Sequence, residues 1–268
     1  MHFRLRAAAL AAVLTAAAAC GGRGVGLLAP SYEYEEDLTL SLDGSATMTV
    51  NASIPALVAL RGMQLNLDPK EAVNRDAIRA IYSSPRAEVT RVTTWTRRGR
   101  RFVGVRMNIP DIHQLSKAVP FSWESYQLRV EGAQAYFRET LGAPSFKPGT
   151  LTNVGWDGTE IVAFRLHLPS RIQWHNARTA DDQPNGVRRG NILSWEQRLT
   201  DRLDNRPIAY AEDKTPGVME VRMDSQSILY RTLWLFGLAF LAAVLVLVFL
   251  IWLTMRKGRA EHPDPHHS

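Results

Sequence analysis

Residues 38–50 read LTLSLDGSATMTV. Apolar and polar side chains alternate on both sides of an Asp-Gly pair, and successive side chains of a strand point to opposite faces. The segment therefore predicts a β-hairpin with one apolar face. The apolar sets of the two strands share that face only if the loop holds an odd number of residues. A three-residue loop pairs Leu42 with Ala46, Leu40 with Met48 and Leu38 with Val50.

Similar patterns continue through residues 31–228. Asp68 before Pro69 is typical of a helix start, and Gly99 separates two alternating runs. The expected fold class is α+β, with antiparallel β-hairpins and intervening helices, plus one C-terminal transmembrane helix. Helices are expected at 55–62, 69–82 and 112–119, and strands at 88–96, 101–109, 126–130, 162–168, 172–174, 192–199 and 218–223.

The first residues resemble an export signal. Arg4 and Arg6 give a positive start, apolar residues 7–19 follow, and small residues precede Cys20. This order describes a secretory signal peptide, because the apolar core is too short to span about 30 Å of hydrocarbon. We expect residues 1–19 to be the signal peptide and residues 20–30 to be a tether.

Two peptidases fit the bond before Cys20. Ala-x-Ala at 17–19 suits the ordinary signal peptidase, whereas small residues before a cysteine that Gly-Gly follows resemble a bacterial lipobox. We predict lipid attachment at Cys20, and a free N-terminal cysteine is the alternative. The chain has one cysteine, so no intrachain disulfide can form.

The C-terminal end predicts a membrane span. Residues 232–254 contain no charged side chain, and at 1.5 Å per residue they extend about 35 Å. Arg256, Lys257 and Arg259 follow, so the positive-inside bias puts the tail, 255–268, in the cytoplasm. The signal peptide puts the domain outside. The expected localisation is the bacterial cell membrane, crossed once, with a periplasmic or otherwise extracytoplasmic ectodomain.

Charge excludes one class of partner. The chain carries a formal net charge of +6, but residues 21–230 hold 26 basic and 24 acidic residues. The exported part is close to neutral, so no nucleic-acid partner is expected. Residues 31–228 suffice for one domain or for two subdomains, near 31–133 and 134–228.

Four arginines surround Gly99 at a predicted hairpin tip: Arg97, Arg98, Arg100 and Arg101. A guanidinium group forks well onto phosphate or carboxylate. The run is interpreted either as a contact for anionic lipid headgroups or an anionic partner, or as a solvated turn whose charges discourage aggregation.

No motif points to catalysis, a cofactor or a metal. His113, His167 and His175 are far apart in sequence, and HExxH, CxxC, GxSxG, Walker and dinucleotide-binding patterns are absent. The adjacent carboxylates at 35–37 and 181–182 would point to opposite faces of a strand, so they are interpreted as solvated charge. We expect no catalytic residue, no metal and no cofactor.

The ectodomain is rich in tryptophan. Such residues form the core and rim of a half-buried sheet, or they line an apolar cavity. Both interpretations stay open for Trp95, Trp123, Trp156, Trp174 and Trp195.

The order of parts resembles bacterial LppM-like envelope proteins, which have a lipobox, an exported α+β domain that opens with a Leu/Thr hairpin, and a C-terminal spanning helix before a basic tail. The resemblance rests on residues 17–21, 37–50, 168–176 and 190–195. The lipobox departs at Ala17, where leucine is usual. The resemblance implies a lipid-associated, non-catalytic envelope protein and assigns no binding residue.

Two functions remain. The first is a membrane-anchored extracytoplasmic protein that is not an enzyme and binds a lipid, an apolar ligand or an envelope partner. The alternative is an envelope hydrolase that acts on lipid or cell wall without a recognisable motif.

Overall fold

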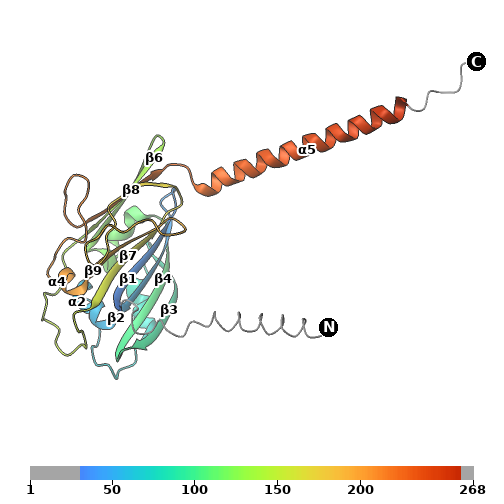
Figure 1. The fold of residues 1–268 in the computed structure, drawn as a ribbon. Helices are drawn as coiled ribbons and strands as arrows, with labels where there is room; N and C mark the ends of the chain where they lie inside the picture. Colours follow the sequence, from blue (N-terminus) through green and yellow to red (C-terminus); the bar gives the residue numbers. More distant parts are fainter. Residues whose placement is uncertain (1–30, 261–268) are drawn as a thin grey trace, which may run out of the picture.

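The computed structural model describes residues 31–260, which form two β-sheets, short helices and one long C-terminal helix (Figure 1). Most strand pairs are antiparallel, so the expected α+β class is confirmed. The predicted signal peptide, Cys20 with its tether at 20–30, and the end of the tail from 261 lie outside the described residues.

The larger sheet has six strands. β1 runs parallel to β7, and its other pairs are antiparallel. Two parallel strands must be joined by a crossover connection. Between β1 and β7 this connection contains all the elements that lie between them in sequence. In spatial order the strands are β3 (Glu88–Arg97), β4 (Arg100–Ile109), β2 (Ala46–Ser53), β1 (Ser31–Leu40), β7 (Glu160–His167) and β9 (Ile192–Arg198).

The smaller sheet has four antiparallel strands. One of them, β6, was not predicted from the sequence, because a glutamate interrupts the apolar set on its buried face. In spatial order the strands are β5 (Glu124–Glu131), β6 (Gln134–Leu141), β10 (Val218–Asp224) and β8 (Ile172–His175).

The first hairpin forms with a different register from the one predicted. Leu40 pairs with Ala46 and Leu38 with Met48, so the three-residue loop is wrong and the loop holds five residues. The Ser41 amide donates to the Ser45 carbonyl at 2.9 Å, which closes the longer loop. The shift is an even number of residues, so each strand still buries the expected face.

The second predicted helix begins later than expected. Asp68 caps only a turn, since its Oδ1 accepts the Lys70 amide at 2.9 Å. The true cap is Asn74, whose Oδ1 accepts the amides of Asp76 and Ala77, each at 3.0 Å. The helices are α2 (Ile54–Arg61), α3 (Arg75–Tyr82) and α4 (Leu199–Leu203), with 3₁₀ turns η1 (Ile112–Lys117) and η2 (Val119–Phe121).

Both sheets share one apolar core, which takes side chains from nearly every strand. Residues 31–133 supply β1 to β5, and residues 134–228 supply β6 to β10. The 133/134 boundary falls in the turn of the β5–β6 hairpin, and each half contributes strands to both sheets. The two halves that the sequence left open as subdomains are therefore interleaved in space.

The C-terminal helix α5 (Ile228–Ala260) leaves one end of the domain (Figure 1). Its segment Ile228–Arg256 has 29 residues, and the most apolar 18-residue stretch within it has a mean hydropathy of 2.9 and buries no residue against the domain. This segment is long and apolar enough to cross a membrane, by its length and composition. The Ile228 amide donates to the Pro169 carbonyl at 3.0 Å, which ties the start of α5 to the end of β7.

Candidate functional site

A buried acidic cluster lies between the two sheets. Glu36 comes from β1, Glu124 from β5 and Glu139 from β6, and their carboxylate oxygens lie within 4.8 Å of one another. The three residues are 2%, 4% and 6% exposed. We call these residues the carboxylate cluster. Among the described residues it is the group whose ligand atoms come close enough together to share a cation.

The sequence places these carboxylates inside through strand alternation. Glu36 is in phase with Leu38, Glu124 with Leu128, and Glu139 with Phe137, each on the buried face of its strand. The interpretation of residues 35–37 as solvated charge is wrong for Glu36. One sequence pattern could have predicted the cluster. In each strand a glutamate stands where the alternation calls for an apolar, buried side chain.

Two arginines enter the same region. Arg61, at the end of α2, binds Glu36 and lies 3.5 Å from Glu124. Its guanidinium stacks 4.9 Å from the Trp123 ring centre, and that of Arg202 from α4 lies 5.5 Å from the same centre. The tryptophan is therefore held by two cations, an arrangement that favours a desolvated guanidinium.

Protonation within the carboxylate cluster is strongly shifted. Burial, and then the charge of Glu124, raise the pKa of the Glu139 carboxyl well above its usual range. Burial and the two neighbouring carboxylates do the same to the pKa of Glu36. Burial also raises the pKa of Glu124, against the opposing pull of Arg61, and lowers the pKa of Arg202 to about 10.

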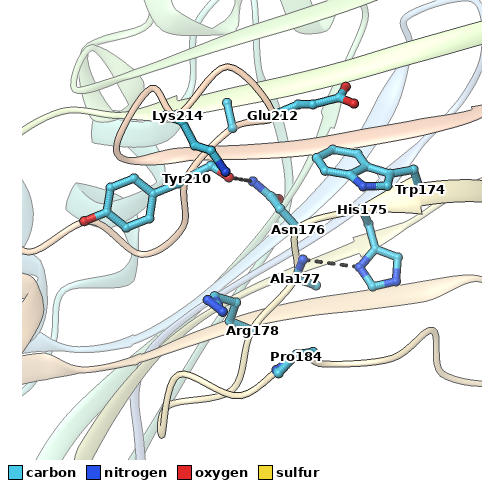
Figure 2. Close-up of a pocket in the computed structure, with 10 residues that line it drawn as sticks. Trp174, His175, Asn176, Ala177, Arg178, Pro184, Tyr210, Glu212 and Lys214 are labelled. Carbon is cyan, nitrogen blue, oxygen red and sulfur yellow. Dashed lines mark hydrogen bonds between the residues drawn. The ribbon is translucent and has the colours of Figure 1, made fainter.

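The second notable feature is an open groove of about 530 Å³ beside β8. In Figure 2, Trp174 and His175 lie on one side of Asn176, and Tyr210 and Lys214 lie on the other. Tyr210 is 54% exposed. β8 is an edge strand of the smaller sheet, and no strand among the described residues pairs with its outer side. The groove therefore combines aromatic surface with the charged side chains of Arg178, Glu212 and Lys214, and two of its lining residues belong to an edge strand.

Asn176 fixes the floor of the groove. Its Nδ2 donates to the carbonyls of Tyr210 at 2.9 Å and Val218 at 2.8 Å. Its Oδ1 accepts the Trp195 indole N–H at 3.0 Å and the Glu220 amide at 2.9 Å. One side chain thus joins the loop that carries Tyr210 to both sheets.

His175 is the one imidazole of the groove lining. Its Nδ1 accepts the Ala177 amide at 3.2 Å, so in the neutral form the proton sits on Nε2. Burial lowers the pKa of His175, which favours that neutral form. The lining contains no serine, threonine or cysteine, so His175 has no hydroxyl or thiol nucleophile of that kind beside it in the groove.

The structure distributes the other histidines singly. His113 binds Asp111 at 2.8 Å, and His167 lies 3.2 Å from Asp37. The predicted tryptophans also separate: Trp195 is 1% exposed in the core, while Trp174 faces the groove. Trp95 is 37% exposed and stacks on Phe102 at the far end of the sheet.

The arginine hairpin is largely satisfied internally. Arg100 is 6% exposed and binds Glu33 at 2.8 Å. Arg101 is 9% exposed and donates to the Glu71 carbonyl at 2.7 Å. Arg97 donates to the carbonyl of Tyr32. The contact with an anionic partner stays a prediction, and Arg98 is the one member fully on the surface.

The hairpin tip and α5 lie at opposite ends of the larger sheet. The tip contacts residues at the start of β1, whereas α5 begins beside Pro169, just after the end of β7, which runs parallel to β1. Ten residues of β1 separate these ends by about 30 Å.

The chain matches no model of a known protein family, and no curated protein is similar enough in sequence to count as a relative. Among solved structures, it resembles the folded domain of LppM from Mycobacterium tuberculosis, determined by NMR. The identity is 13%, the match covers 76% of this chain and 95% of that domain, and the TM-score is 0.36. This is a weak structural likeness, and no functional conclusion rests on it.

Proposed function

We propose that this chain is a membrane-anchored extracytoplasmic protein that carries out no chemistry and binds an extended segment of an envelope partner in the groove beside β8. Residues 20–30 and α5 would keep the domain near the bilayer. Tethering raises the effective concentration of the groove toward other components of the same membrane.

The groove is the observation that carries this proposal. An edge strand offers unpaired backbone groups that a partner strand can extend, and side chains beside it set specificity. Trp174 and Tyr210 supply the rigid aromatic surface that is enriched at interfaces, and Lys214 supplies a cation for an acidic partner residue.

Because the groove is open to solvent, it suits a partner segment better than an apolar ligand that must be enclosed. The space between the sheets is filled by the core, Arg61 and the carboxylate cluster. Trp123 and Trp195 are thus part of the packed interior and do not line the groove. A lipid would have to bind at the surface, with its chains largely in water.

The groove lining places no serine, threonine or cysteine beside His175, which supports binding rather than hydrolysis by such a nucleophile. A hydrolytic site needs a nucleophile and a base within hydrogen-bond reach, and His175 already accepts a backbone amide at Nδ1. A hydrolase would therefore need catalytic groups from elsewhere on the chain.

The test is crosslinking in the native membrane with the full chain. A photoreactive residue replaces Tyr210 in the groove, or Val187 as a control that is 45% exposed outside the groove lining. We expect a discrete protein adduct at position 210, none at 187, and loss of the adduct when Trp174→Ala is added.

Other outcomes are equally informative. A lipid adduct at position 210 would replace the partner proposal with the lipid-binding one. Equal adducts at both positions, or an adduct that survives Trp174→Ala, would show that the groove does not select a partner.

A further inference from the structure

Charge in the carboxylate cluster does not balance without an added positive charge. Glu36, Glu124 and Glu139 face two guanidinium groups, those of Arg61 and Arg202. Arg61 holds Glu36 and approaches Glu124, but Glu139 forms no ion pair with any residue of 31–260, and its buried Oε1 has no hydrogen-bond partner there. A fully ionised Glu139 would be a buried, unpaired charge, which is among the costliest groups in a protein interior.

We propose that the carboxylate cluster holds one exchangeable proton, which keeps the two sheets packed together and whose loss as pH rises loosens the domain. The proposal is independent of the groove and its partner. It assigns to the interior a proton site that spans both sheets, since Glu36 belongs to the larger sheet and Glu124 and Glu139 to the smaller.

Charge and geometry favour a proton over a metal ion. The Arg61 guanidinium already binds Glu36 and lies 3.5 Å from Glu124. A divalent cation among the same oxygens would be pressed against that guanidinium and would leave the region with a net positive charge. A proton neutralises the third carboxylate and turns it into a donor for a neighbouring oxygen.

Two packed elements contribute no titratable or charged group. β10 places Met219 opposite Glu139, and η2 contributes the Pro120 carbonyl, which accepts a hydrogen bond from Arg61. Neighbouring tyrosines stay neutral, so the proton is held among the carboxylates. Burial raises the pKa of Tyr82 to about 12, and burial with the charge of Glu124 raises the pKa of Tyr126 well above its usual range. The titratable or charged groups that the other packed elements contribute are Glu36 and Tyr34 from β1, Arg61 from α2, Tyr82 from α3, Glu124 and Tyr126 from β5, and Arg202 from α4.

The sign of the pH dependence follows from linkage. The folded-state pKa of the cluster lies above the unfolded glutamate value, so the folded state binds more protons in the interval between them. The contribution to stability is full below the unfolded pKa and is lost as pH rises through the folded pKa. Release of one proton changes the unfolding equilibrium about tenfold per pH unit within that window.

The experiment measures denaturant unfolding of the full chain in detergent micelles, by tryptophan fluorescence, from about pH 6 to about pH 9 with a chelator present. Wild type is compared with Glu139→Gln, which is permanently neutral, and with Glu131→Gln, whose side chain is 58% exposed. We expect wild type and Glu131→Gln to lose stability as pH rises. Over the same pH range, the unfolding constant of Glu139→Gln should rise by a factor at least tenfold smaller than that of wild type.

Infrared spectroscopy gives a second reading that needs no stable variant. At neutral pH the wild-type chain should show the C=O stretch of a buried protonated carboxylic acid, and alkaline titration should remove it. Absence of this band, or equal pH slopes for wild type and Glu139→Gln, would overturn the proposal. Stabilisation by Mg²⁺, Ca²⁺ or Zn²⁺ that disappears in Glu139→Gln would also overturn it and would make the cluster a metal site.

Discussion

Single side chains hold the most consequential contacts of this domain. Asn176 uses both amide hydrogens and its oxygen in four hydrogen bonds, and its partners belong to β9, β10 and the loop at Tyr210. Arg61 is similarly placed, because it binds Glu36 and donates to the Pro120 carbonyl while it stacks on aromatic rings. Both residues join segments that are distant in sequence.

Asn176→Asp should destabilise the domain strongly although it changes almost no volume. The carboxylate cannot donate to the carbonyls of Tyr210 and Val218, and it places a charge against them. We expect a loss of about 3 kcal/mol in the free energy of unfolding. Denaturant unfolding of the full chain in micelles measures it, and Asn185→Asp, with one such bond to the Ser194 carbonyl, should cost less.

Arg61→Met should cost about 3–5 kcal/mol at neutral pH, because it leaves the carboxylate cluster with one guanidinium. The loss should shrink toward pH 5, where protonation removes the unpaired charge. Arg98→Met, at the exposed hairpin tip, is the control and should change the unfolding midpoint little. A pH-independent loss would mean that Arg61 acts by packing alone.

At the scale of elements, glycines with positive φ end α2 and turn the β3–β4 hairpin. Gly62 has φ of 66° and caps α2, and Gly99 has φ of 73° in the two-residue turn. An added Cβ at Gly62 would lie 2.9 Å from the Ser145 hydroxyl, whereas nothing lies within 4 Å at Gly99. A substitution at Gly99 therefore tests backbone strain alone, whereas one at Gly62 tests backbone strain together with steric contact.

Gly99→Ala should cost about 1 kcal/mol, which is the conformational penalty of a left-handed residue. Gly62→Ala should cost more, because Ser145 must also move. Thermal unfolding of the two variants in parallel tests the difference. If Gly62→Ala,Ser145→Ala costs as much as Gly62→Ala alone, steric contact is not the reason.

At the scale of the whole molecule, α5 is the segment that is long and apolar enough to anchor the domain in a membrane. It begins four residues after β10 ends and is joined to the end of β7 through the Pro169 carbonyl. The arginine hairpin lies about 30 Å away along the strands. A domain that stands upright on α5 would therefore keep Arg98 away from the headgroups of that bilayer.

Removal of α5 by a stop after residue 227 should shift the chain from the membrane fraction when Cys20→Ser is also present. With Cys20 intact, partial membrane retention is expected if the cysteine is lipidated. Cell fractionation of the four combinations checks both anchors. Full release of the chain that lacks α5 but keeps Cys20 would contradict lipidation.

A reporter fused after residue 268 tests topology. The positive residues after the span predict a cytoplasmic C-terminus, so a fluorescent protein should fold there and alkaline phosphatase should stay inactive. Phosphatase activity would show that the C-terminus lies outside the cytoplasm. The domain with its groove would then lie inside the cell, opposite to the predicted orientation.

The sequence by itself determined the alternating strands, the α+β class and the apolar C-terminal helix, because these depend on local periodicity and length. Tertiary structure alone decided the parallel β1–β7 pair, the five-residue first loop and the late start of α3 at Asn74. It also brought Glu36 of β1 to Glu124 and Glu139 of the β5–β6 hairpin, which lie 88 and 103 residues further along the chain. Periodicity shows which face each glutamate occupies, but only the packing of two sheets shows what that face meets.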